Sequence, residues 1–108
     1  MADQMTETAI QAALGDLPDW KHQDGLVTVY KTPTSAGALA LIAAIGRIAE
    51  EQQHHPDLEW RYNRVFLRYV THDAGGHVTQ RDVAAAKAVS GAAAETGAVA
   101  QPGRYPAS

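Results

Sequence analysis

The sequence predicts an α+β domain in which helices and β-hairpins alternate, in the order helix, hairpin, helix, hairpin, helix. Two turn-forming pairs, Asp24-Gly25 and Asn63-Arg64, each stand between runs rich in β-branched and aromatic residues, which indicates two hairpins. Three other segments repeat apolar residues at the spacing of one helical face. This order favours a four-stranded antiparallel sheet with the three helices packed on one face.

The first helix leads directly into the first hairpin. Thr6 can cap this helix, in which Ile10 and Leu14 belong to one apolar stripe. A glycine and a proline follow the stripe and end the helix. Residues 20–23 and 26–30 are then expected to pair as strands around the Asp-Gly turn.

The second helix is expected to be the most buried of the three. Thr34 or Ser35 can cap it, and it runs to about Gln53. Pro56 disfavours helical geometry at His55, so we expect the helix to stop at the histidine pair itself. Its apolar residues occupy more than one face, so one face should cover the sheet and a second should meet another subunit. They comprise Leu39, Leu41, Ile42, Ile45, Ile48 and Ala49.

The second hairpin lies between Leu58 and His72, around the turn Asn63-Arg64. Counting outward from that turn predicts the cross-strand pairs Tyr62 with Val65, Trp60 with Leu67, and Leu58 with Tyr69. Thr79 and Asp82 then resemble a capping box, with Asp in place of the usual Glu or Gln. A third helix is expected to follow.

Length and composition predict one cytoplasmic domain. A chain of 108 residues supports a single modest core, which we assign to residues 1–95, with residues 96–108 as a mobile C-terminal tail. The net charge of −3 and the dispersed basic residues argue against nucleic-acid binding, and the lack of cysteine excludes thiolate chemistry. We expect no signal peptide and no membrane association, because the apolar run 36–49 is too short to span a bilayer.

The chemistry that the sequence offers is concentrated in its histidines. His54 and His55 are adjacent, and Glu50 lies one helical turn before His54, so the Glu50 and His54 side chains are expected to meet. A carboxylate there would favour the protonated imidazole, which suits a general acid. Because the second hairpin runs out and back, its end brings His72 close to His55. Three imidazoles are thus predicted around one pocket.

Other interpretations of these residues stay open at this point. Histidines near a helix end are often caps or solvated side chains, and we interpret His22 and His77 in this way. A metal site built from the adjacent pair and His72 is a further alternative, although neighbouring imidazoles diverge and suit zinc less well than His-x-x-x-His spacing. Asp82 can equally be a simple helix-start residue.

Several motifs taken together resemble those of a known family. They are Glu50-x-x-x-His54-His55-Pro56, Tyr62-Asn63-Arg64-Val65, Thr71-His72-Asp73 and the single residue Asp82. From the first helix to about Val89, the chain resembles the pterin-4a-carbinolamine dehydratase family. The resemblance implies the same alternation of helices and hairpins, and assembly into a homodimer or a homotetramer.

The resemblance also implies a reaction, the dehydration of a 4a-hydroxytetrahydropterin to the quinonoid dihydropterin in tetrahydrobiopterin recycling. The reaction needs an acid for the departing hydroxyl and a base for a ring-nitrogen proton, without metal or redox cofactor. The residues implied as catalytic are His54, His55 and His72, with His54 and His72 as acid and base and His55 mainly positioning the pterin. The residues implied in substrate binding or support are Glu50, Pro56, Tyr62, Thr71, Asp73 and Asp82.

The chain departs from the family pattern around the expected pocket. Thr32 and Ser35 stand where aromatic residues are common, and Leu58 stands where many members have an aromatic or β-branched residue. The loop 75–79 is one residue longer than usual, with His77 as the insertion. These departures affect substrate fit more than catalytic competence. The alternative function that the resemblance implies is non-catalytic: a dimerisation partner and coactivator of a transcription factor, or an assembly chaperone of the carbon-fixing carboxylase.

Overall fold

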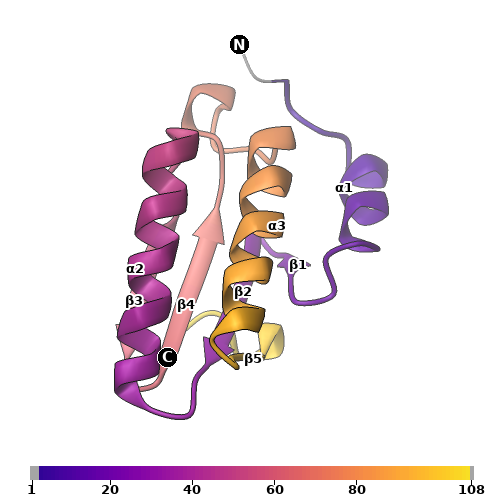
Figure 1. Ribbon diagram of the computed structural model, residues 1–108. Helices are drawn as coiled ribbons and strands as arrows, with labels where there is room; N and C mark the ends of the chain where they lie inside the picture. Colours follow the sequence, from indigo (N-terminus) through magenta and orange to yellow (C-terminus); the bar gives the residue numbers. More distant parts are fainter. Residues whose placement is uncertain (1–2, 108) are drawn as a thin grey trace.

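Two layers, one of helices and one of antiparallel strands, make up the domain (Figure 1). The computed structural model describes residues 3–107, and these form three α-helices and five β-strands; residues 1, 2 and 108 lie outside the described part. In chain order the elements are α1 (Glu7–Leu14), β1 (Lys21–His22), β2 (Leu26–Lys31), α2 (Ser35–Gln52), β3 (Asp57–Arg61), β4 (Arg64–Tyr69), the 3-10 helix η1 (His72–Ala74), α3 (Gln80–Glu95), β5 (Val99–Ala100) and the 3-10 helix η2 (Pro102–Arg104). The predicted α+β class and the order of helices and hairpins are confirmed.

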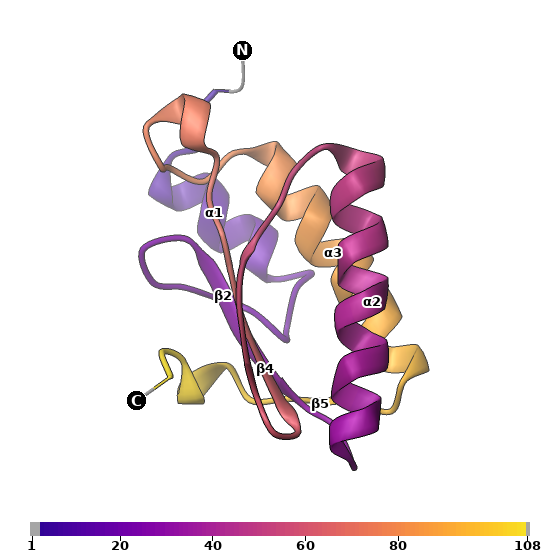
Figure 2. The ribbon, with the colours of Figure 1, turned by 90° about the vertical axis from the view of Figure 1, so that its left-hand side faces the viewer.

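The sheet has the order β1-β2-β4-β3, and β5 pairs with the remaining part of β2. β2 and β4 therefore form its centre, and β3 lies at an edge. Helices α2 and α3 lie side by side over one face, and α1 lies beyond α3 (Figures 1 and 2). No helix among residues 3–107 is long and apolar enough to cross a membrane.

The second hairpin turns one residue earlier than the sequence predicts. Its turn is Tyr62-Asn63, and the observed pairs are Arg61 with Arg64, Trp60 with Val65 and Leu58 with Leu67. Two hydrogen bonds between Asn63 and Thr32, a residue outside the hairpin, hold this register. The Asn63 side-chain amide donates to the Thr32 carbonyl at 2.8 Å, and the Asn63 carbonyl accepts from the Thr32 amide at 2.8 Å. Tyr62 takes the left-handed conformation of the turn, with φ 51°. The two faces of the strands keep their predicted residues, because the register moves by two positions.

The first hairpin also differs from its predicted turn. His22 pairs with Leu26, so the loop contains residues 23–25 rather than two residues. Gly25 has φ 118°, and a Cβ atom added to it would lie 2.8 Å from a methyl group of Val70. Glycine is required at this position both for its backbone conformation and for the close approach of β4.

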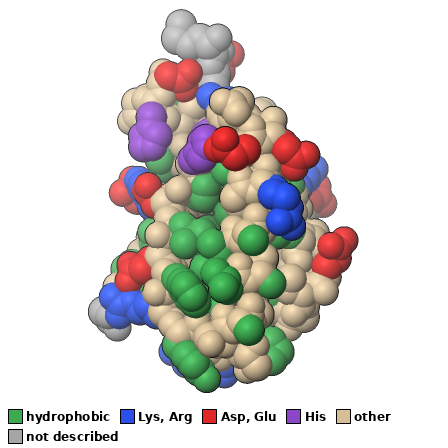
Figure 3. All heavy atoms as spheres, turned by 60° about the vertical axis from the view of Figure 1, so that its left-hand side comes forward, with side chains coloured by type: hydrophobic (Ala, Val, Ile, Leu, Met, Phe, Trp, Pro, Cys, Tyr) green, Lys and Arg blue, Asp and Glu red, His purple; other side chains and the backbone are tan. Residues whose placement is uncertain are grey.

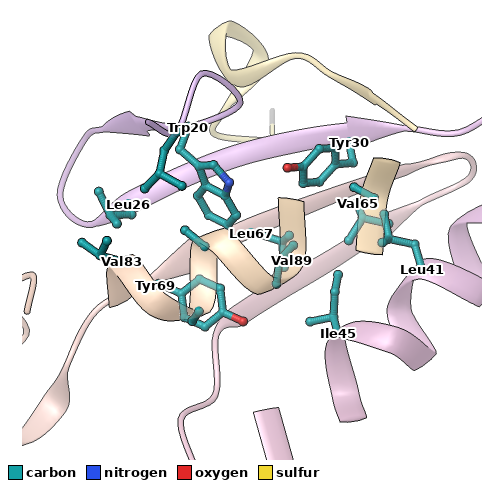
Figure 4. Packing of buried hydrophobic residues seen from close by; sticks show 14 of the residues in the cluster. Trp20, Leu26, Tyr30, Leu41, Ile45, Val65, Leu67, Tyr69, Val83 and Val89 are labelled. Atoms are coloured by element: carbon teal, nitrogen blue, oxygen red, sulfur yellow. The ribbon is translucent and has the colours of Figure 1, made fainter. Parts of the chain in front are cut away.

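The core lies between the sheet and the helices α2 and α3. Leu41 and Ile45 of α2, which were expected to cover the sheet, are fully buried, whereas Leu39 on the other side of α2 is 54% exposed. The labelled core side chains in Figure 4 are Trp20, Leu26, Tyr30, Leu41, Ile45, Val65, Leu67, Tyr69, Val83 and Val89. Burial of these side chains is the main term that stabilises the fold.

Residues 99–107 correct the expectation of a four-stranded sheet, because they add the short strand β5 and the 3-10 helix η2. β5 pairs with β2, and the Gln101 amide donates to the Val29 carbonyl at 2.7 Å. The segment then passes over the face of the sheet that α2 and α3 leave uncovered (Figure 2). Val29 and Phe66 point toward this face, and both are buried. The pattern was missed because a two-residue strand leaves no periodicity in the sequence.

Candidate active site

His54 occupies the point where the chain leaves α2. The helix ends at Gln52, and Gln53 takes the left-handed conformation with φ 51° and ψ 44°, which reverses the direction of the chain. His54 consequently lies outside the helix and turns inward, with only 6% of its surface exposed. Its Nε2 lies 2.5 Å from Oδ1 of Asp82, a residue of the first turn of α3 that is completely buried. The two residues form a buried imidazole–carboxylate pair.

The other oxygen of Asp82 connects this pair to the segment between β4 and η1 and to the start of α3. Oδ2 accepts hydrogen bonds from the Thr71 hydroxyl and from the Thr79 backbone amide, each at 2.9 Å. Because the Thr71 hydrogen is used in this way, the Thr79 hydroxyl donates to the Thr71 oxygen at 2.7 Å. The predicted capping box is present. Asp82 thus serves both as a helix-start residue and as the partner of His54.

The expected contact between Glu50 and His54 is wrong. Glu50 instead pairs with His55, with Oε2 and Nε2 2.6 Å apart, and both side chains are exposed, by 74% and 59%. The physical reason is the helix end: residues four apart lie over one another only while the helix continues, and the reversal at Gln53 exchanges the two histidines. The chain therefore has two histidine–carboxylate pairs, one buried and one solvated.

His72 lies in η1, directly after Thr71, and is exposed. Since Thr71 and His54 bind the same carboxylate, the chain places His72 at the same end of the molecule as the pair. Backbone bonds between Thr71 and the residues Gly76 and His77, each at 3.0 Å, close the loop that carries η1. On the face shown in Figure 3, histidine side chains gather at this end with acidic side chains beside them.

The remaining predicted site residues divide into two groups. Pro56 lies between His55 and β3, and Asp73 is exposed in η1, 3.9 Å from an Arg81 nitrogen. Tyr62 stands apart, because it forms the turn at the opposite end of β3 and β4 and is 75% exposed. A strand of six residues such as β4 extends over about 20 Å, so Tyr62 does not reach these histidines within one chain.

Tyr69 is a neighbour of His54 that sequence reasoning did not include in the site. Its ring stacks on the imidazole, with centroids 5.7 Å apart and planes 22° apart. Its hydroxyl is buried and has no hydrogen-bond partner among residues 3–107. Burial, together with the nearby Asp82 carboxylate, raises the pKa of the Tyr69 hydroxyl to about 12. The sequence signal was its place on the apolar face of β4, two residues before Thr71.

Two hollows flank this end of the molecule. A broad groove of about 890 Å³ follows α2, and its lining residues are Ala43, Gly46, Arg47, Ala49, Glu50, Glu51 and His55. A smaller pocket of about 260 Å³ lies on the other side of the η1 loop, where His22 binds Glu7 at 3.0 Å and His77 is exposed. Within the described range 3–107, no three or more histidine or acidic side chains are arranged to hold a metal ion.

Comparison with known proteins places this geometry in a family. Residues 3–92 match the family described as Pterin 4 alpha carbinolamine dehydratase. The chain belongs to this family. Family membership, together with relatives named as pterin-4-alpha-carbinolamine dehydratases, makes the chain an enzyme of the hydro-lyase class.

Relatives cover most of the chain. One of these dehydratases, from Thermomicrobium roseum, is 40% identical over 84 residues, which are 77% of this chain and 89% of that protein. Another, from Acidobacterium capsulatum, is 44% identical over 80 residues, 73% of this chain and 86% of the relative. A crystal structure of a transcriptional coactivator/pterin dehydratase from Brucella melitensis has a TM-score of 0.79 at 29% identity and covers 83% of this chain and 98% of its own. β5 and η2 lie beyond the family match.

Proposed function

We propose that the chain dehydrates a 4a-hydroxytetrahydropterin to the quinonoid dihydropterin, with histidines as acid and base. The observation that carries the proposal is the presence of two histidine–carboxylate contacts, His54 with Asp82 and His55 with Glu50, at one end of the molecule. His72 lies at the same end, directly after Thr71, which donates a hydrogen bond to Asp82. In the reaction, the C4a–O bond breaks as the hydroxyl receives a proton and leaves as water, and a ring nitrogen gives up a proton. Two imidazoles, each of which can donate or accept a proton, fit this need.

We assign the proton transfers to His54 and His72. Nε2 of His54 is occupied by Asp82, so Nδ1, which makes no hydrogen bond with any residue in 3–107, is the atom available to substrate. His72 is exposed and free to meet the opposite side of a bound ring. His55, paired with Glu50 at the surface, orients the pterin, and Pro56, Thr71 and Asp73 support the walls of the site. We propose tetrahydrobiopterin recycling in the cytoplasm as the setting of this reaction, because of the family's substrate.

The test uses freshly generated 4a-hydroxytetrahydropterin, whose decay is followed with and without the protein. The wild type should accelerate decay well above the spontaneous rate, and His72→Ala should lower kcat by about 10²- to 10⁴-fold, as expected for loss of a general acid or base. His77→Ala is the matched control, because His77 is an exposed histidine of the same loop that lines the other pocket, and it should leave kcat within about twofold. A wild type that leaves the decay rate unchanged refutes the proposal.

We also propose that the protein is a homodimer or homotetramer. Every residue of the edge strand β3 is exposed, although Leu58 (38%) and Trp60 (47%) belong to its apolar face. Apolar side chains gather over this part of the surface in Figure 3, next to the exposed side of α2 that carries Leu39. An exposed strand edge beside an apolar surface favours association with another chain. Sedimentation analysis should give a mass of two or four chains, and Trp60→Glu should lower it; a monomeric wild type contradicts the proposal.

A second candidate function is a non-catalytic one, in which the protein is a dimerisation partner, coactivator or assembly chaperone. The Brucella protein, whose name joins a coactivator to a dehydratase, and the apolar surface at β3 favour it. That function does not require the histidines. A protein that lacks dehydratase activity, yet has a partner whose binding is unchanged in His54→Ala and His72→Ala, would establish this second candidate.

A further inference from the structure

The imidazole of His54 is held by two contacts of different kinds. Asp82 contacts the edge of the ring at Nε2, and Tyr69 contacts its face. Nε2 lies near the axis of the Cβ–Cγ bond, so the ring can turn about that bond while the distance to Asp82 changes little. This torsion is intrinsically broad in histidine. The hydrogen bond therefore places the ring, but leaves the direction of Nδ1 weakly determined.

The Tyr69 ring supplies the missing constraint. Its plane lies within 22° of the imidazole plane, so a turn of the imidazole about Cβ–Cγ would break the parallel stacking of the two rings. Tyr69 cannot retreat, because Trp20 packs against it at 5.8 Å between centroids and is itself fixed by a 2.9 Å hydrogen bond from its indole nitrogen to Ser90. A continuous row of aromatic contacts, tilted between Trp20 and Tyr69 and stacked between Tyr69 and His54, thus runs from the core to the ring that faces the site.

We propose that Tyr69 is a positioning residue for the dehydration, whose ring fixes the plane of His54 and so directs Nδ1 toward the substrate. The effect of Tyr69 on catalysis rests on the proposed function, whereas its effect on the plane of the His54 ring rests on the stacked rings alone. The hydroxyl of Tyr69 has no part in it, since that group has no partner in the described part of the chain. Ring and hydroxyl can therefore be tested separately.

The experiment compares Tyr69→Leu, which removes the flat ring, with Tyr69→Phe, which keeps it. Phe66→Leu is the matched control for the loss of a buried aromatic ring, because Phe66 lies on the opposite face of β4. We expect Tyr69→Leu to lower kcat by about tenfold or more with KM changed less than about twofold, since misdirected catalytic groups act on the reacting step. Tyr69→Phe and Phe66→Leu should keep kcat near that of the wild type.

A second measurement detects the ring of His54 directly. The ¹⁵N and ¹H signals of its imidazole should form one sharp set in the wild type and in Tyr69→Phe, and should broaden or double in Tyr69→Leu. Tyr69→Met, which fills the space without a flat face, gives the same comparison should the leucine variant fail to fold. Unchanged His54 signals in either variant overturn the inference, as does a loss of kcat in Tyr69→Phe equal to that in Tyr69→Leu. A wild type without dehydratase activity refutes the proposed function. The imidazole signals would then still show whether the Tyr69 ring fixes the plane of His54.

Discussion

Replacing Asp82 with asparagine tests the central contact of the site, because it removes the charge and keeps the shape. The carboxylate accepts from His54 at 2.5 Å, and from Thr71 and the Thr79 amide at 2.9 Å each. An asparagine has one accepting oxygen. If that oxygen accepts from Thr71 and Thr79, the NH₂ group of the asparagine faces Nε2 of His54. Because the NH₂ group is a donor, Nε2 can contact it only as an acceptor, without its proton.

The size of the effect follows from these contacts. Hydrogen bonds to a charged group contribute about 1.5–3 kcal/mol each, and the Asp82 carboxylate accepts three of them. Because asparagine keeps two of the three bonds in weaker form, we expect the free energy of unfolding of Asp82→Asn to fall by about 2–4 kcal/mol. We expect kcat to fall about a hundredfold or more, since the proton of His54 moves to Nδ1.

Denaturant unfolding and the decay assay measure the two effects, and the ¹⁵N signals of His54 report which nitrogen carries the proton. Asp73→Asn is the matched control, because that carboxylate is exposed and 3.9 Å from Arg81, and a surface change there should alter stability by less than about 0.5 kcal/mol. If Asp82→Asn unfolds like the control and leaves the His54 proton on Nε2, the buried pair does not organise the site.

Three further predictions concern other parts of the chain. Because the Tyr69 pKa is raised to about 12, the unfolded state ionises first as pH rises above about 10, so wild-type stability should decline by about 2–3 kcal/mol between pH 10 and 12 through this group. Tyr69→Phe should lack that contribution in alkaline denaturant titrations and, without the unpaired hydroxyl, should be no less stable at pH 7; an identical alkaline decline contradicts this. Truncation after Thr96 should uncover Phe66 and lower the free energy of unfolding by about 2–3 kcal/mol. Binding of a hydrophobic dye is a second readout. A truncated chain as stable as the whole would show that the segment does not protect the sheet. Gly25→Ala should cost about 1–3 kcal/mol because of φ 118° and the approach of β4, whereas Gly91→Ala, in an open helical position, should gain up to about 1 kcal/mol; equal Tm values for the two variants would refute the argument.

The capping box shows why some of the site could be predicted. Thr79 and Asp82 are three residues apart, and their contact depends only on the start of one helix. Spacing along the chain was therefore sufficient to find it. The partner of His54 could not be predicted in this way, because Asp82 is 28 positions away and arrives through the packing of α3 against α2.

At the end of α2, the sequence pattern predicts where the helix stops, but packing decides which side chains meet. Pro56 correctly indicated that α2 ends near the histidine pair, but the choice of which histidine meets Glu50 depended on one left-handed residue, Gln53. A shift of a single residue at a helix end reverses which side chain is buried. The second hairpin also differs by one residue from its prediction: its turn begins at Tyr62, and the contact between Asn63 and Thr32 fixes the register.

The amino-acid order alone was enough to establish the α+β class, the alternation of helices and hairpins, and the family motifs, because these depend on periodicity and short spacings. Three features arose only from long-range packing: the buried pair of His54 with Asp82, the Tyr69 ring against that imidazole, and the return of the C-terminal segment to the sheet. Each joins residues whose separation along the chain carries no local pattern. Their contacts are selected by the close packing of the core and by the need of buried polar groups for partners.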